Sequence, residues 1–409
     1  MKIKHFKYNS RQFFSIVDEM DCPIDPYIST YINMILISKA PNTIRRYVNE
    51  LIFVISFFND LPSRFASQRL LSNEEYNAFF RHCYYPINGR KGVDIASFSI
   101  ENKDIRNIIS ANSRIHSQVR PETIQGRLRR LREYSEWLFN HFHHDYLVGE
   151  QLQNKFDTLI SRMKLCEEGF GKNFSLAVKR INESVIPNDK FLELLEMILP
   201  SSSKNPFKSS KIRNYLIVSL LIQSGIRRGA LAKLKISDCH FYGTFDEIEI
   251  YRSGYDKTDT RNYMPNQKTK SHLAVVDPEL LKQIKFYINH IRLNFERSSY
   301  HDFIFVSEKN SRNTSGNPLS LKSVNAIFLR LSKALSFRIH PHMLRHKWNE
   351  IFDEKGRSSG MDSRLIEDVR KYAMGWSANS SMGQVYNEKR LFEQVREVSK
   401  AHQERVNKQ

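Results

Sequence analysis

The sequence predicts a mainly α-helical (α+β) protein of two domains, the second of which also holds a small antiparallel sheet. With 409 residues the chain is longer than one typical domain of about 150 residues, and 40% of its residues are apolar, so each domain can bury a core of its own. Apolar residues recur at spacings of three and four in most long stretches, which is typical of amphipathic helices. In contrast, residues 247–251 alternate charged and apolar side chains, which indicates a strand.

The pattern of the N-terminal half is helical. Helices are predicted to begin at Pro41 and Pro121, because proline is favoured in the first turn of a helix and apolar residues follow each proline at helical spacing. A less regular helical pattern covers residues 27–37. We therefore expect a helical domain over residues 27–145, followed by a connecting helix and linker over residues 146–184.

Two segments of this half have no clear pattern. Residues 1–26 are interpreted as an N-terminal arm or extension, which is either a further contact with a binding partner or a disordered start. Residues 62–118 are irregular, and we assign them no role.

The second domain is expected to cover residues 185–409. Residues 211–224 are apolar nearly all round, which predicts a deeply buried helix. Residues 247–251 and 272–276 predict the strands of a small sheet, and helices resume at Pro278 and continue to the end of the chain.

The chain is strongly basic, with a formal charge of +19 and a pI near 9.6. The excess of cations is unevenly divided, at +6 for residues 1–184 and +13 for residues 185–409. Such a charge indicates a polyanionic partner, either a nucleic acid or a membrane surface. The four cysteines have no C-x-x-C spacing, and the N-terminus lacks the apolar core of a signal peptide, so we expect a cytoplasmic protein that does not enter the membrane.

Arginines cluster on the predicted helices of the N-terminal domain. Arg45 and Arg46 follow the first helix start, and Arg127, Arg129 and Arg130 lie on the second helix. They are interpreted either as a solvated helix surface or as a surface that contacts the DNA backbone.

Four short segments of the second half carry a chemically coherent set of side chains. Taken singly each is weak evidence, because an arginine at a helix end or a lysine in a turn is commonly structural or solvated. The segments are Gly225-Ile226-Arg227, Gln267-Lys268-Thr269-Lys270, Pro341-His342-Met343-Leu344-Arg345-His346, and Met374-Gly375-Trp376-Ser377 with Tyr386 ten residues after the tryptophan. A helix is expected just after Pro341, with His342 and Arg345 on the same face.

These side chains suit phosphoryl transfer without a metal ion. Arginines, a lysine, a tryptophan and a tyrosine are poor metal ligands, and the sequence has no phosphate-binding loop of the G-x-x-x-x-G-K-[ST] type and no H-E-x-x-H motif. The charge that develops on a phosphate would then be met by arginines, and the nucleophile would come from the protein.

The order and spacing of the segments resemble the catalytic domain of the tyrosine recombinases, or phage-type integrases. The His-x-Leu-Arg-His element is the most specific match, and the five elements follow in the family's order over about 160 residues. The resemblance implies a mostly helical catalytic domain with a small antiparallel sheet. It also implies that the N-terminal helices form a SAM-like domain that binds the core DNA site.

The same resemblance implies a role for each residue. Tyr386 would attack the scissile phosphate and form a 3′-phosphotyrosyl link, which stores the bond energy so that rejoining needs no ATP. Arg227 and Arg345 would bind the non-bridging oxygens.

The remaining roles concern protons and support. Lys268 would protonate the leaving 5′-oxygen, His342 would assist proton transfer at the nucleophile, and Trp376 would donate one hydrogen bond from its indole N–H. No cofactor is implied. The expected partners are double-stranded DNA and further copies of the chain, in a tetramer held through the C-terminal helix, as in DNA integration and excision by mobile elements.

Other assignments are possible for several of these positions. Lys270 is the alternative to Lys268, and Arg228 is the alternative to Arg227. His340 is interpreted as a structural or backbone contact, and His346 as structural support. Tyr251 and Tyr372 are interpreted as core or strand residues.

The sequence departs from the family pattern at two places. Ala230 stands where many members have an acid, and the interval from Gly375 to Tyr386 is about one residue longer than usual. Two other functions therefore stay open: a DNA-binding accessory protein with impaired catalysis, and a DNA-relaxing enzyme of the type IB topoisomerase kind.

Overall fold

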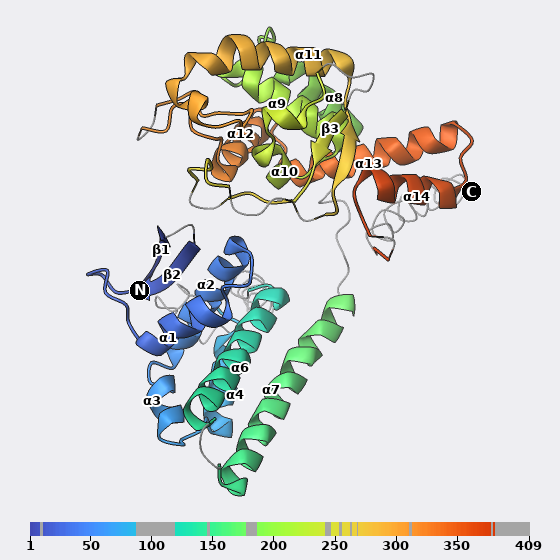
Figure 1. Ribbon diagram of the computed structural model, residues 1–409. Helices are drawn as coiled ribbons and strands as arrows, with labels where there is room; N and C mark the ends of the chain where they lie inside the picture. Colours follow the sequence, from blue (N-terminus) through green and yellow to red (C-terminus); the bar gives the residue numbers. More distant parts are fainter. Residues whose placement is uncertain are drawn as a thin grey trace, which may run out of the picture. The chain divides into compact units, whose positions relative to one another are not determined.

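The computed structural model describes most of the chain (Figure 1). The described residues are 1–8, 11–86, 119–144, 148–176, 186–241, 247–252, 256–261, 264–267, 269–310, 313–377 and 379–380. The chain divides into two compact units, Met1–Val178 (unit 1) and Lys179–Gln409 (unit 2).

Unit 1 begins with an antiparallel hairpin of strands β1 (Lys2–Tyr8) and β2 (Arg11–Val17). Phe14 and Ile16 are buried, and β2 contacts the helices that follow it. The expectation for residues 1–26 left a disordered start open; the hairpin contradicts that alternative. These strands were hard to predict because β2 is apolar on both faces and so lacks the alternation that indicates a half-buried strand.

The rest of unit 1 is helical. Its helices are α1 (Pro26–Thr30), which continues as the π-helical turn η1 (Tyr31–Ile35), α2 (Pro41–Phe57), α3 (Leu61–Ala66), α4 (Asn73–His82), α6 (Pro121–His143) and α7 (Glu150–Leu176). The two helix starts predicted at Pro41 and Pro121 are confirmed. Helix α6 contacts α2, α3 and α7, and the apolar faces of α2 and α6 are buried.

Unit 2 holds helices around a two-stranded sheet, as the sequence predicted. Its elements are α8 (Asn188–Ile198), α9 (Lys211–Ser224), α10 (Arg228–Lys233), η3 (Ile236–Asp238), β3 (Glu247–Ile250), β4 (His272–Val275), α11 (Pro278–Phe286), η4 (Tyr287–Ile291), η5 (Arg292–Asn294), η6 (Glu296–Tyr300), α12 (Leu321–Ala334), α13 (Pro341–Ser358) and α14 (Ser363–Ala373). Strands β3 and β4 pair antiparallel. Helix α14 folds back along α13 (Figure 1). Buried Arg370 of α14 joins Asp353 of α13 in an ion pair.

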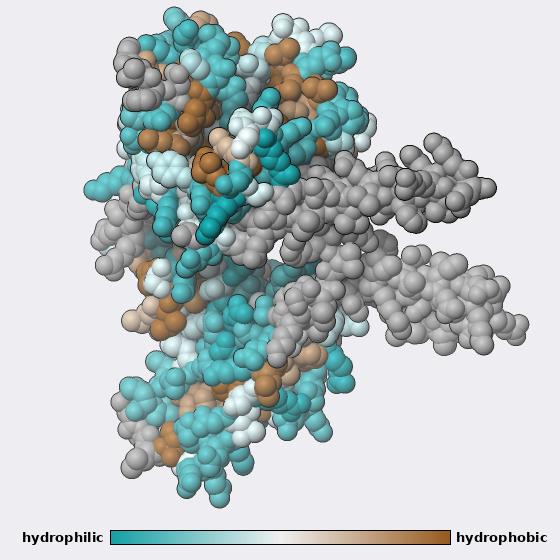
Figure 2. Space-filling model, turned by 90° about the vertical axis from the view of Figure 1, so that its right-hand side faces the viewer, coloured by the Kyte–Doolittle hydropathy of each residue, from teal (hydrophilic) through white to brown (hydrophobic). Residues whose placement is uncertain are grey.

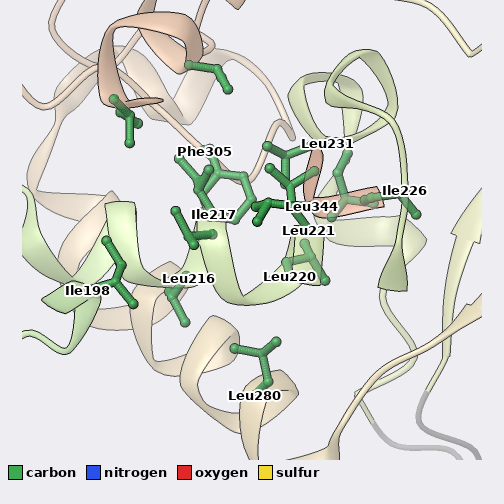
Figure 3. Close-up of a cluster of buried hydrophobic side chains, with 14 of the residues drawn as sticks. Ile198, Leu216, Ile217, Leu220, Leu221, Ile226, Leu231, Leu280, Phe305 and Leu344 are labelled. Atoms are coloured by element: carbon green, nitrogen blue, oxygen red, sulfur yellow. The ribbon is translucent and has the colours of Figure 1, made fainter. Parts of the chain in front are cut away.

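The core of unit 2 is built around α9. Leu216, Ile217, Leu220 and Leu221 of this helix have no exposed surface. Figure 3 shows them together with Leu231 of α10 and with Ile226 and Leu344, which directly precede Arg227 and Arg345 in the chain. The apolar positions of the motif segments therefore fix the backbone from which the cationic side chains extend.

The surface is mainly hydrophilic on the face that Figure 2 shows, with exposed apolar side chains in separate patches. Within the described part of the chain, no helix combines the length and the apolar character that crossing a membrane requires.

Candidate functional site

The first motif segment lies at the end of the buried helix α9. Gly225 ends the helix in a left-handed conformation, with φ of +60°, which glycine adopts without strain. A Cβ at this position would lie 2.7 Å from the Met374 side chain and 2.9 Å from the ring of Trp348. The tight turn places Arg227, half-buried, immediately before helix α10.

The second segment forms the first turns of helix α13. Pro341 occupies the first turn, so His342 and Arg345 lie one turn apart on the same face, as predicted. Arg345 is 2% exposed, and its Nη1 donates a hydrogen bond of 2.7 Å to the carbonyl of Gly225.

A second donor from α13 reaches the same helix end. Trp348 Nε1 donates to the carbonyl of Gln223 at 2.8 Å. The last carbonyls of a helix have no partner within the helix, so these two bonds satisfy groups that burial would otherwise make costly. They also fix the two arginine-bearing segments to each other.

The third segment brings Trp376 to the same place. Gly375 has φ of +60°, and its carbonyl accepts a hydrogen bond of 2.9 Å from the backbone N–H of Lys270. Trp376 is 7% exposed, and its ring centroid lies 5.7 Å from Cζ of Arg345. The structure therefore brings together Arg227, His342, Arg345 and Trp376 from three separate parts of the sequence.

Lys268 and Tyr386, the predicted general acid and nucleophile, lie outside the described residues. The chain on either side of Lys268 is anchored. Gln267 and Thr269 are buried and hydrogen-bonded to each other. The choice between Lys268 and Lys270 stays a prediction.

The anchoring of this loop depends on two glycines. The carbonyl of Asn266 lies so near Gly229 of α10 that a Cβ there would be 2.7 Å from it. On the other side, a Cβ at Gly375 would overlap His272 and lie 2.6 Å from the carbonyl of Lys270. Gly229 thus permits a close approach of the loop to the segment of Arg227, and Gly375 permits one to the segment of Trp376.

The cationic side chains of the site affect the pKa of His342. Burial lowers the pKa of His342 to about 4, with further lowering by the positive charges of Arg345, His340 and Arg227. The ring of His346 also contacts it, with centroids 4.5 Å apart. His342 is therefore neutral at pH 7 in the free protein.

His272 also belongs to this site, although its sequence pattern predicted only a strand residue. It opens β4, and its Nδ1 lies 3.1 Å from the carbonyl of Lys270. Burial lowers the pKa of His272, and the charges of Arg345 and Arg227 lower it further. In the sequence, only its position four residues after Lys268 indicated that His272 could lie near the site.

A cavity of about 500 Å³ opens beside His272 and Trp376. Tyr251 and Tyr372 both contribute to its lining. The interpretation of Tyr372 as a core residue is wrong, because it is 77% exposed on α14. Tyr251 follows strand β3 and donates a hydrogen bond of 2.9 Å to the buried carboxylate of Asp238.

Comparison with known proteins places these residues in a family. Residues 186–391, which are half of the chain, match the model described as the phage integrase family. The chain belongs to the phage integrase family.

Individual relatives agree with this membership. The tyrosine recombinase XerA of Pyrococcus furiosus is 30% identical over 163 residues, which are 40% of this chain and 47% of that protein. The type 1 fimbriae regulatory protein FimB of Escherichia coli K12 is 26% identical over 202 residues, which are 47% of this chain and 84% of FimB. The chain spans about half the length of the two XerA relatives that it matches.

A solved lambda integrase dimer bound to a COC′ core site is 13% identical to the chain, with a TM-score of 0.45. The match covers 88% of this chain and 94% of the integrase chain. This likeness is too loose to add to the family match.

Ala230 stands where the sequence resemblance led us to expect an acidic residue. The structure places Ala230 in the core of unit 2, at 5% exposed, in the cluster that includes Leu231 and Ile248. Ala230 also lines a small cavity together with Lys233, Asp238 and Glu249. A longer side chain at this position would therefore meet charged groups as well as the apolar core.

The phage integrase model leaves unit 1 unmatched, and its predicted DNA contacts need correction. Arg130 is fully buried, with Nη1 2.7 Å from Glu133 and Nε 3.5 Å from Glu50. Arg127 is 5% exposed, and its Nη1 donates to the carbonyls of Cys83 and Tyr85. Neither guanidinium can reach a DNA phosphate, since each is enclosed by the domain that it stabilises.

The other three arginines of unit 1 reach the surface. Arg129 is partly exposed and paired with Glu167 at 2.5 Å. Arg46 is exposed and lies 3.5 Å from Glu50, and Arg45 is exposed on the same helix. DNA contact by these three residues stays a prediction.

Proposed function

We propose that the chain is a site-specific DNA recombinase, which cleaves and rejoins DNA through a 3′-phosphotyrosyl link at Tyr386 without metal or ATP. The observation that carries the proposal is the convergence of Arg227, His342, Arg345 and Trp376 in a domain of the phage integrase family. Relatives named as tyrosine recombinases support the same activity.

The arginines would bind the non-bridging oxygens of the scissile phosphate. A guanidinium offers paired donors in one plane and stays charged at any working pH. The hydrogen bond from Arg345 to Gly225 fixes that plane during folding, so little reorganisation is needed when a phosphate arrives. Trp376 would add the single hydrogen bond that its indole N–H can donate.

His342 would accept the proton of the attacking tyrosine. A pKa of about 4 keeps its imidazole neutral, so it can act as a base at pH 7. The negative charge of a bound phosphate would offset the arginine charges and raise that pKa, which stabilises the protonated imidazole once it forms. Lys268 would supply the proton for the leaving 5′-oxygen.

The proposed partners are double-stranded DNA and further copies of the chain. The excess of +13 over residues 185–409 suits a phosphate-binding unit. The C-terminal stripe of Leu391, Phe392, Val395 and Val398, outside the described residues, would hold a tetramer together. The protein would act in the cytoplasm, in integration or excision of a mobile element.

Covalent trapping tests the proposal and identifies the target site in the same experiment. The protein is incubated with a library of nicked duplexes, denatured in detergent, and the DNA that stays attached is recovered and sequenced. We expect attachment of DNA through a 3′-phosphate in the native protein and none in Tyr386→Phe.

A matched control is Tyr372→Phe, which removes a hydroxyl from an exposed tyrosine on α14. This variant should trap DNA at a rate close to that of the native protein. Undiminished attachment in Tyr386→Phe would exclude Tyr386 as the nucleophile, and loss of attachment in Tyr372→Phe instead would move the assignment there.

A further inference from the structure

The starts of two helices in unit 2 each carry two basic side chains. Arg227 and Arg228 lie at the start of α10, and His340 and His342 lie at the start of α13. The proposed catalytic site uses Arg227 and His342. Arg228 and His340 have no role in it.

The two histidines are each affected by a different pair of arginines. Their rings are nearly parallel, at 13°, with centroids 6.5 Å apart. His342 lies on the side of Arg345 and Arg227, whose charges act on it. Burial lowers the pKa of His340, and there the acting charges are those of Arg338 and Arg228.

The two arginines near His340, Arg228 and Arg338, keep their charge. Arg228 Nη1 donates to the side-chain carbonyl of Asn325 on α12, and an amide orients a guanidinium without neutralising it. Among the residues that the structure describes, Arg228, Arg338 and His340 form no ion pair with a carboxylate. Arg228 is partly buried, and burial lowers its pKa. A bound anion would offset this cost.

We propose that Arg228, Arg338 and His340 form a second phosphate subsite, which binds the backbone phosphate next to the scissile phosphate on the same DNA strand. This inference rests on the proposed function, because it assumes a scissile phosphate at Arg227 and Arg345. Phosphates of one strand are spaced by about 3.4 Å of rise along the helix axis, so the neighbouring phosphate lies close to the first site. The contact would fix the register of the strand and read no base.

A double-mutant cycle, in which the protein and the DNA are each changed singly and together, tests the subsite directly. The DNA is the sequence recovered from trapped adducts, with one neutral methylphosphonate placed on either side of the scissile phosphate. We expect this change at one of the two positions to weaken binding by the native protein about tenfold, the usual scale for a charge-assisted contact. The double variant Arg228→Ala and His340→Ala should bind unmodified DNA more weakly and lose nothing further with that methylphosphonate.

Two further variants guard against indirect effects. Arg228→Lys keeps the charge and should retain part of the sensitivity to the methylphosphonate. Lys282→Ala removes one exposed cation from α11 and should leave that sensitivity intact. An equal loss in the native protein and the double variant at both positions would overturn the subsite.

Failure of the proposed function gives a different result, namely no covalent adduct with any DNA. The subsite is then tested by the salt dependence of binding to a random-sequence duplex. Its slope should fall by about one unit in the double variant and stay unchanged in Lys282→Ala. An unchanged slope in the double variant overturns the subsite whether or not adducts form.

Discussion

The arginines of α6 in unit 1 and the cations at the starts of α10 and α13 in unit 2 look alike in sequence and differ in their partners. On α6, Arg130 lies against Glu50 and Glu133, and Arg132 lies 3.0 Å from Glu167. In unit 2, the partner of Arg228 is a neutral amide. A basic run therefore predicts a phosphate-binding surface only where its partners leave the charge uncompensated.

The comparison predicts that the α6 arginines matter chiefly for folding. Arg130→Ala should destabilise unit 1 by about 3–5 kcal/mol, because it leaves Glu50 and Glu133 without their buried partner. Hydrogen exchange along α2 and α6 in the full chain measures this free energy of unfolding. The same peptides in Arg228→Ala, a variant of unit 2, should exchange as in the native protein. Normal protection of α2 and α6 in Arg130→Ala would show that the charge cluster is not structural.

The next largest effect concerns the joint between α9 and α13. Gly225→Ala forces a left-handed conformation on alanine and places a methyl group against Met374 and Trp348. We expect a loss of about 1–3 kcal/mol in the stability of unit 2, together with a displaced Arg345.

A control for this variant is Gly360→Ala. Gly360 also has a positive φ, of +76°, but no atom lies within 4 Å of its Cβ position. It should lose only the backbone part of the stability and keep covalent trapping of DNA. Equal trapping by the two variants would show that the close approach at Gly225 does not position Arg345.

These contrasts show what sequence could and could not predict. The helices beginning at Pro41, Pro121 and Pro341 follow from local rules of proline placement and apolar spacing, and the structure confirms them. The burial of Arg130 depends on Glu50, which is 80 residues away, so no local pattern contains it.

The candidate site divides in the same way. The family motif identified Arg227, His342, Arg345 and Trp376, which the structure brings together. It did not identify His272, whose closeness to Gly375 results from the pairing of distant loops. It gave Arg228 no role beyond that of an alternative to Arg227, because Asn325, the partner of Arg228, lies 97 residues away in the sequence.

A smaller effect is expected from pH. The unfolded chain protonates His342 near pH 6.5, whereas in the folded protein its pKa is about 4. Between these values the unfolded state binds more protons than the folded state. His342 therefore lowers the free energy of unfolding as the pH falls from 6.5 to 4, and its contribution changes no further below pH 4. His340 and His272, whose pKa values are also lowered, act in the same direction.

Denaturation of native protein and His342→Gln across this range checks the contribution of His342. The difference in stability between them should change from pH 6.5 to 4 and be constant above pH 7. A difference that is independent of pH would contradict the lowered pKa. Since a bound phosphate offsets the arginine charges, duplex DNA should raise the pKa of His342, which NMR titration of the imidazole resolves.

The smallest effect is expected for Arg129, the α6 arginine that is both partly exposed and paired with a carboxylate. Its side chain is 38% exposed, and its partner Glu167 also binds Arg132. Arg129→Ala should therefore cost less than about 1 kcal/mol, because Glu167 keeps one cation and the exposed pair is weak. The affinity of Arg129→Ala for a random-sequence duplex should change less than that of Arg228→Ala, because Glu167 already offsets the charge of Arg129. A tenfold loss of affinity with a smaller salt slope would instead place Arg129 on the DNA backbone, and the rule drawn from the two regions would then fail for exposed pairs.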